Sequence, residues 1–170
     1  MKSFLRRKQA QAIAAMVMAI VVLATLIGLG LSTGIAGAAS PNGSGAHKEP
    51  LTTTNRDCDG VVSGTPQTES FGFVIINKTA SGKLIANVVL ENAIANTTYH
   101  FRLIQTPNSV TGDCQPFDGP GEATLTTDAL GNGNANYQEA VIDGATGAFV
   151  AINNAANPAN DFFTTQVVNP

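Results

Sequence analysis

The sequence predicts an all-β fold of about seven antiparallel strands behind an N-terminal export leader. From residue 71 onward, apolar and polar residues alternate with a period of two, which indicates strands rather than helices. The alternating segments are short and are bounded by Gly, Asn, Asp and Pro, residues that favour turns. No convincing amphipathic helix lies between them, so residues 57–170 are expected to form one antiparallel sandwich or barrel.

Residues 1–39 have the composition of an export leader. Four basic residues lie within the first eight positions, Ile13–Leu31 is continuously apolar, and the small-residue run Ala36–Ser40 follows. This order is typical of a signal peptide that is cleaved after Ala38 or Ala39. The alternative is an uncleaved membrane anchor, because about 19 apolar residues can span a hydrocarbon core of roughly 30 Å. Both interpretations predict a secreted or cell-surface domain, which meets the membrane only through this leader.

Residues 40–56 predict a flexible polar tether, because they combine Pro, Gly, Ser and Thr with almost no apolar residue. The domain is then expected to occupy 57–170. Its predicted strands are Phe71–Asn77, Lys83–Glu91, Thr98–Thr106, Glu122–Thr127, Gly133–Glu139, Gly147–Asn153 and Phe162–Val168.

The alternation also predicts which side chains form the core. One face of the second strand and one face of the third are wholly apolar, and the residues concerned are Leu84, Ala86, Val88, Leu90, Tyr99, Phe101 and Leu103. Ala80–Gly82 fits a short hairpin turn between the first two strands, and Asp128–Gly133 fits a turn between the fourth and fifth. Neighbouring strands are therefore expected to pair as in a meander.

Cys58 and Cys114 are the two cysteines of the chain. In an exported protein, two cysteines most simply form one disulfide. Closing a loop of about 57 residues would stabilise the fold by about 4 kcal/mol on the chain-entropy account.

The charge distribution argues against nucleic-acid binding. Four of the nine basic residues lie in the leader and all twelve acidic residues lie beyond it, so five bases against twelve acids leave the rest of the chain at −7. Such a surface repels phosphate backbones, and no basic stripe is present to release counterions.

The sequence predicts no metal or other cofactor. A copper or zinc site needs clustered histidines, whereas this chain has only His47 and His100, of which His100 is expected to face solvent or the second sheet. Asp128 with nearby Asn residues suggests a weak calcium site as an alternative to a simple turn. The spacing is wrong for an EF-hand loop, so the turn is preferred.

The chain is expected not to be an enzyme. It carries no nucleophile signature such as G-x-S-x-G, and Glu69, Glu91, Glu122 and Glu139 all lie at strand ends, where carboxylates are expected to be solvated. The alternative is a secreted hydrolase whose carboxylates converge only in the fold.

The segment Ala93–Leu103 (AIANTTYHFRL) resembles the entry to the F strand of fibronectin type III and related immunoglobulin-like modules. A turn there precedes Thr-x-Tyr and alternating apolar residues. Leu125–Ala135 is similar to hairpins of secreted bacterial proteins of unknown function. The resemblance implies an immunoglobulin-like β-sandwich in which Tyr99 closes a tyrosine corner. Ala93 and Ala95 depart from the family pattern, and four predicted strands follow where the family has one.

These observations favour an exported, non-catalytic module that binds or adheres to an unknown extracellular or envelope ligand. Ligand contacts are expected on loops at one end of the sandwich, such as Thr106–Gly121 or Asn153–Asp161. A further alternative is a structural subunit that self-assembles through an exposed edge strand, with Phe162–Val168 as the expected edge.

Overall fold

The computed structural model describes residues 45–115 and 122–170. The predicted leader at 1–39, the start of the predicted tether at 40–44 and part of one predicted loop at 116–121 lie outside these residues. Within the described ranges, no helix has both the length and the apolar character needed to cross a membrane.

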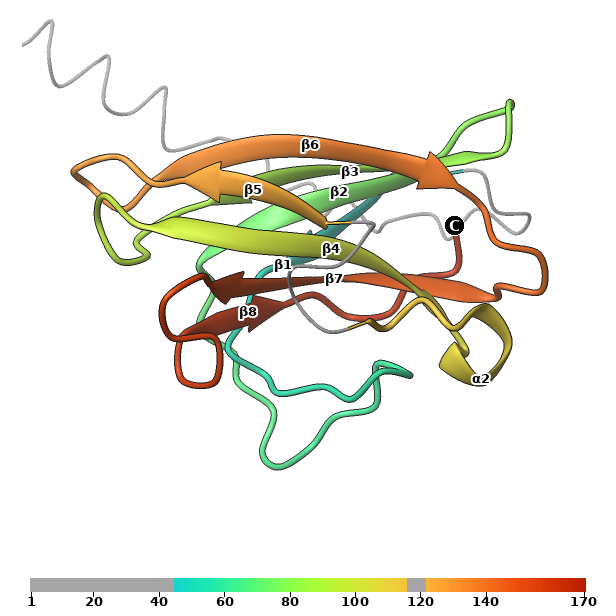
Figure 1. Ribbon diagram of the computed structural model, residues 1–170, viewed down its shortest axis with the longest axis horizontal. Coiled ribbons are helices and arrows are strands. Elements are labelled where there is room, and N and C mark those ends of the chain that lie inside the picture. Colours follow the sequence, from blue (N-terminus) through green and yellow to red (C-terminus); the bar gives the residue numbers. More distant parts are fainter. Residues whose placement is uncertain (1–44, 116–121) are drawn as a thin grey trace, which may run out of the picture. The chain divides into compact units, whose positions relative to one another are not determined.

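The described chain is built of strands, with one short helix (Figure 1). In order they are β1 (His47–Pro50), β2 (Gly72–Lys78), β3 (Lys83–Leu90), β4 (Thr98–Thr106), α2 (Asn108–Thr111), β5 (Glu122–Thr126), β6 (Gly133–Ala140), β7 (Gly147–Asn154) and β8 (Phe162–Thr164). The predicted all-β class is confirmed, and six of the seven predicted strands begin and end within one residue of an observed strand.

The strands form two four-stranded antiparallel sheets. Sheet A has the order β1-β2-β3-β6 and sheet B has the order β5-β4-β7-β8. The two sheets form separate layers, with β6, β3 and β2 in one and β4, β7 and β8 in the other (Figure 1). The arrangement is a β-sandwich, and the chain passes between the layers three times: after β3, after β5 and after β6.

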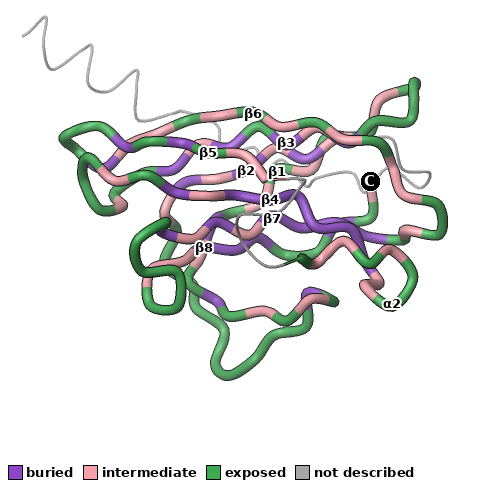
Figure 2. Tube along the Cα trace, viewed as in Figure 1, coloured by how far each residue is buried: buried purple, intermediate pink, exposed green. Residues whose placement is uncertain are grey.

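The core lies between the two sheets and follows the alternation in the sequence. In β3, buried residues alternate with more exposed ones, and the predicted inward residues Leu84, Ala86, Val88 and Leu90 are at most 1% exposed. In β4, Tyr99, Phe101 and Leu103 are likewise buried, as predicted. Figure 2 shows the longest buried stretches on β4 and β7, the two central strands of sheet B, whose outer face is also covered.

The predicted meander pairing is wrong at three junctions, because β3 and β4, β5 and β6, and β6 and β7 lie in different sheets. β5 belongs to sheet B and β6 to sheet A, so the Asp128–Gly133 turn connects the two layers instead of closing a hairpin. Asp128 Oδ1 accepts hydrogen bonds from the backbone N–H groups of Leu130 and Asn132, and Gly131 adopts a φ of 80°. Local turn chemistry is satisfied equally well by a hairpin or a crossover, so it could not distinguish them.

The predicted tether is wrong for residues 47–56. β1 pairs with β2 at the edge of sheet A, and Leu51 after it is fully buried. Thr52 then pairs with Thr164 of β8, so this segment joins the edges of both sheets. Its polar composition concealed the structure, because edge pairing uses backbone groups and requires no apolar side chain.

The last predicted strand, Phe162–Val168, is also shorter than expected. β8 ends at Thr164, and Val168 makes only an isolated bridge to Ala148. Because Thr52 lies against β8, the edge expected to be exposed is instead covered.

Candidate functional site

A pocket of about 290 Å³ lies on the outer face of sheet B, where three loops cover the strands. We call it the sheet B pocket. Its floor is formed by outward residues of β4, β7 and β8, and its walls by the segments 55–58, 114–115 and 158–159. The lining residues are Asn55, Arg56, Asp57, Cys58, Arg102, Ile104, Cys114, Gln115, Phe149, Ala151, Asn153, Pro158, Ala159, Phe162 and Thr164.

Both loops predicted to carry ligand contacts line this pocket. Loop 106–121 contributes Cys114 and Gln115, and loop 153–161 contributes Pro158 and Ala159. The prediction that such loops share one end of the sandwich is wrong, because β4 and β7 are antiparallel and the loops leave sheet B at opposite ends. They meet only because each folds back over the outer face of the sheet.

A disulfide holds the third loop over the sheet. Cys58 and Cys114 are joined with an S–S length of 2.06 Å and a Cα–Cα distance of 5.5 Å. Next to it, the backbone N–H of Asn108 donates to Asp59 Oδ1 at 2.6 Å. Gly60 has a φ of 75°, and a Cβ at this position would come within 2.1 Å of Val167 Cγ2, so a larger residue would lift the loop from the sheet.

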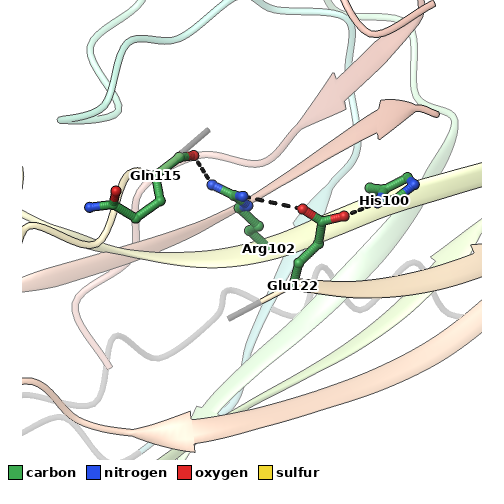
Figure 3. A network of polar contacts seen from close by, with 4 residues as sticks. All are labelled: His100, Arg102, Gln115 and Glu122. Carbon is green, nitrogen blue, oxygen red and sulfur yellow. Dashed lines mark hydrogen bonds and ion pairs between the residues drawn. The ribbon is translucent and has the colours of Figure 1, made fainter. Parts of the chain in front are cut away.

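Arg102, in the floor of the pocket, belongs to a polar network on β4 and β5 (Figure 3). Arg102 is 3% exposed; it pairs with Glu122 Oε2 at 3.2 Å and donates to the carbonyl oxygen of Gln115. The other oxygen of Glu122 contacts His100 Nδ1. Glu122 is therefore not a solvated strand-end carboxylate as predicted, because the guanidinium of Arg102 on the neighbouring strand pairs with it.

Arg56 brings a second guanidinium to the pocket, and it has far fewer partners. Its Nη1 donates to the carbonyl oxygen of Gly60 at 2.8 Å, whereas its buried Nε has no acceptor. Among the described residues, no carboxylate lies within 4.0 Å of this group. Burial lowers the pKa of Arg56, and the charge of Glu49 opposes that shift only in part.

Tyr99 holds the end of the 153–161 loop. Its hydroxyl donates to Asp161 Oδ2 at 2.8 Å and accepts from the backbone N–H of Ile94, five residues upstream, at 3.2 Å. Asn154 Nδ2 donates to the same carboxylate oxygen at 2.8 Å. Burial, together with the bond to Asp161, raises the pKa of Tyr99 to about 12, so the hydroxyl remains a donor at physiological pH.

A second cluster of acidic residues lies at the edge of the core. Glu139 of β6 shares the inward face with Tyr137, and Gln105 Nε2 donates to its Oε1 at 2.8 Å. Asp113 Oδ2 accepts from the backbone N–H of Gln105 at 2.6 Å. Burial first, and the charge of Asp113 second, raise the pKa of Glu139 to about 7. The prediction that Glu139 is solvated is therefore wrong.

Two further observations concern the calcium site near Asp128 that was predicted as an alternative. A more open groove of about 620 Å³ runs along β3 and β6 on the outer face of sheet A, with Asn87, Asn134 and Asn136 among its lining residues. Asp128 also lines this groove, but its Oδ1 is engaged by the turn described above. In the part of the chain that the structure describes, no three His, Cys, Asp or Glu residues are grouped so as to hold a metal ion.

The sequence did not identify Arg56 and Arg102 as site residues, because isolated cations usually lie on solvated surfaces. The sequence nevertheless contains a feature that indicates the position of each of these residues. Arg102 alternates with the core residues Phe101 and Leu103, which places it with His100 on the outer face. Arg56 lies two residues before Cys58, and the disulfide holds that segment against the sheet. No family model and no curated protein matches the chain.

Proposed function

We propose that this chain is an exported, non-catalytic binding module with an immunoglobulin-like fold, and that the sheet B pocket receives its ligand. One observation carries the proposal: three loops from distant parts of the chain, two of them joined by the disulfide, enclose one pocket over sheet B. Loops held on a rigid sheet are a common way for β-sandwiches to build binding sites.

The strand order supports the immunoglobulin-like part of the proposal. With β2, β3 and β6 as strands A, B and E, and β5-β4-β7-β8 as C′-C-F-G, every sheet neighbour matches that topology. β1 is then an additional strand before A. In this alignment Tyr99 lies on strand C, whereas the family's tyrosine corner lies on strand F. The same hydrogen bond from tyrosine to upstream backbone would then stabilise the entry to strand C.

Export is supported by the order of the leader and by the disulfide. The test is the non-reduced intact mass of the protein from cell fractions of its host. Loss of about 39 residues and two hydrogens in the secreted fraction is expected for a released domain. A full-length mass in the membrane fraction would indicate an anchored domain, and a reduced, full-length protein in the cytoplasm would contradict export.

Ligand-observed NMR with a library of small anionic, neutral and cationic compounds tests the pocket. Ala159→Trp would fill its mouth from an exposed position, and Ala156→Trp is the matched control, because Ala156 is exposed on the same loop but does not line the pocket. We expect compounds that compete for one site and whose binding is lost in Ala159→Trp but not in Ala156→Trp. A library without such binders would contradict the proposed function.

A second candidate, self-assembly, is favoured by one observation on β6. This eight-residue strand ends sheet A, and its outward residues Asn134, Asn136 and Gln138 are exposed and uncharged. Long edges whose exposed side chains carry no charge favour pairing with another chain. Sedimentation over a range of concentrations tests this candidate: Asn136→Lys should abolish any assembly, and Asn87→Lys on the central strand β3 should not.

A further inference from the structure

We infer that the sheet B pocket binds a small carboxylic acid with an apolar body, and that Arg56 holds its carboxylate. This inference rests on the proposed function and adds the chemical class of the ligand. It starts from the unequal surroundings of the two guanidinium groups that line the pocket.

Arg102 is already engaged by groups of the protein itself. It is 3% exposed, it pairs with Glu122, and it donates to the carbonyl oxygen of Gln115 (Figure 3). A buried charge with a partner of opposite sign and a backbone acceptor is satisfied. Arg102 therefore forms the floor and fixes the neighbouring segment through Gln115.

The guanidinium of Arg56 has fewer partners than that of Arg102. It is partly buried, its hydrogen bond within the described chain is to one backbone carbonyl, and no described carboxylate is within ion-pair distance. A partly desolvated guanidinium with free donors gains most from a carboxylate, whose two oxygens match the planar fork. The energetic cost of burying Arg56 is thus recovered when an anion binds.

The pocket lining also includes an acidic side chain. Asp57 is the carboxylate among the described lining residues, and its Oδ1 already accepts from the backbone N–H groups of Asp59 and Val61 at 2.9 Å each. These two bonds hold Asp57 Oδ1 against the backbone of its own loop, so that oxygen is not available to a ligand.

Apolar side chains provide the rest of the contact surface. Ile104 and Phe149 come from the two central strands, Phe162 from β8, and Pro158 from the covering loop. A volume of about 290 Å³ is at the lower limit of small-molecule sites. The pocket thus suits one ring or a short aliphatic chain that ends in a carboxylate.

Phenylacetate and its neutral isostere phenylacetamide are the probes, titrated by NMR into the protein as recovered from its host. We expect phenylacetate to bind about tenfold more tightly, the usual contribution of a hydrogen-bonded charge pair. Arg56→Gln should remove that preference without changing the fold, whereas Lys48→Gln, on exposed β1 away from the pocket, should retain it. Arg56→Lys should keep only part of it, because an ammonium lacks the planar fork.

Three outcomes would overturn the inference. The first is equal affinity for phenylacetate and phenylacetamide, and the second is a preference that survives Arg56→Gln. The third is inorganic phosphate binding as tightly as phenylacetate, which would indicate a bare anion site. If neutral compounds still bind and are displaced by Ala159→Trp, the inference fails but the proposed function stands; if no compound is sensitive to Ala159→Trp, both fail.

Discussion

The hydroxyl of Tyr99 lies 2.8 Å from Asp161 Oδ2, although the two residues are 62 positions apart in the sequence. Tyr99 is fully buried in the core and Asp161 closes the loop that follows β7. One hydrogen bond therefore connects the centre of the sandwich with a loop that lines the sheet B pocket.

Tyr99→Phe should lower the free energy of unfolding by about 1–3 kcal/mol, because the change removes a donor and an acceptor and leaves the N–H of Ile94 and the carboxylate of Asp161 without this partner. Urea denaturation measures the change. Asp161→Asn and the double variant complete a cycle, and strictly additive effects would show that the hydroxyl and the carboxylate do not act together.

Leu51→Ala tests whether the segment after β1 belongs to the folded domain. Leu51 is fully buried, so the substitution should cost about 2–5 kcal/mol in the free energy of unfolding. Leu130→Ala is the matched control, because Leu130 is 77% exposed and its loss should cost almost nothing. Equal stabilities of the two variants would show that residues 47–56 are a tether and do not belong to the folded domain.

Replacing both cysteines with serine should destabilise the domain by about 4 kcal/mol, because the bridge closes a long loop in the unfolded chain. The same variant should weaken binding in the sheet B pocket, since Cys58 and Cys114 hold two of its walls. Denaturation curves of the oxidised wild type and the variant measure the first effect. An unchanged midpoint would show that the bridge does not constrain the unfolded state.

Glu139 should make stability depend on pH. Its folded pKa of about 7 lies above the ordinary 4.5, so the folded state favours the protonated acid. The resulting stabilisation is complete below pH 4.5 and is lost as the pH rises through 7. The melting temperature of the wild type should therefore fall over this interval by more than that of Glu139→Gln. Parallel curves of melting temperature against pH for the two proteins would show that Glu139 does not cause the dependence. Glu91→Gln, at an exposed site, is the control.

Arg102→Met should be strongly destabilising, by about 3–5 kcal/mol, because it leaves the buried carboxylate of Glu122 without its principal cation. Adding Glu122→Gln to that variant should restore part of the loss, since the double variant has no isolated charge there. Thermal unfolding of the single and double variants measures both effects. A double variant that is less stable than Arg102→Met would show that the network stabilises by hydrogen bonding alone.

The sequence predicted local structure well wherever one face of a strand is buried. Leu84 to Leu90 alternate without interruption, and β3 follows them within one residue. Prediction from the sequence failed where the position of a segment depends on backbone pairing or on contacts between residues far apart in the chain. β1 has no apolar side chain to reveal it, and the partners of β5 depend on which sheet the chain enters after Asp128. Arg56 gains its role only because the disulfide brings its segment over sheet B.

The position of the disulfide also determines how the domain would bear mechanical force. A pull applied from the N-terminal side first loads the pairing of β1 with β2 and the contact of Thr52 with Thr164. If these connections rupture, unravelling reaches Cys58, and the covalent bond then transfers the tension directly to Cys114. The residues between the two cysteines, which include β2, β3 and β4, are bypassed, so these three strands would remain unstretched.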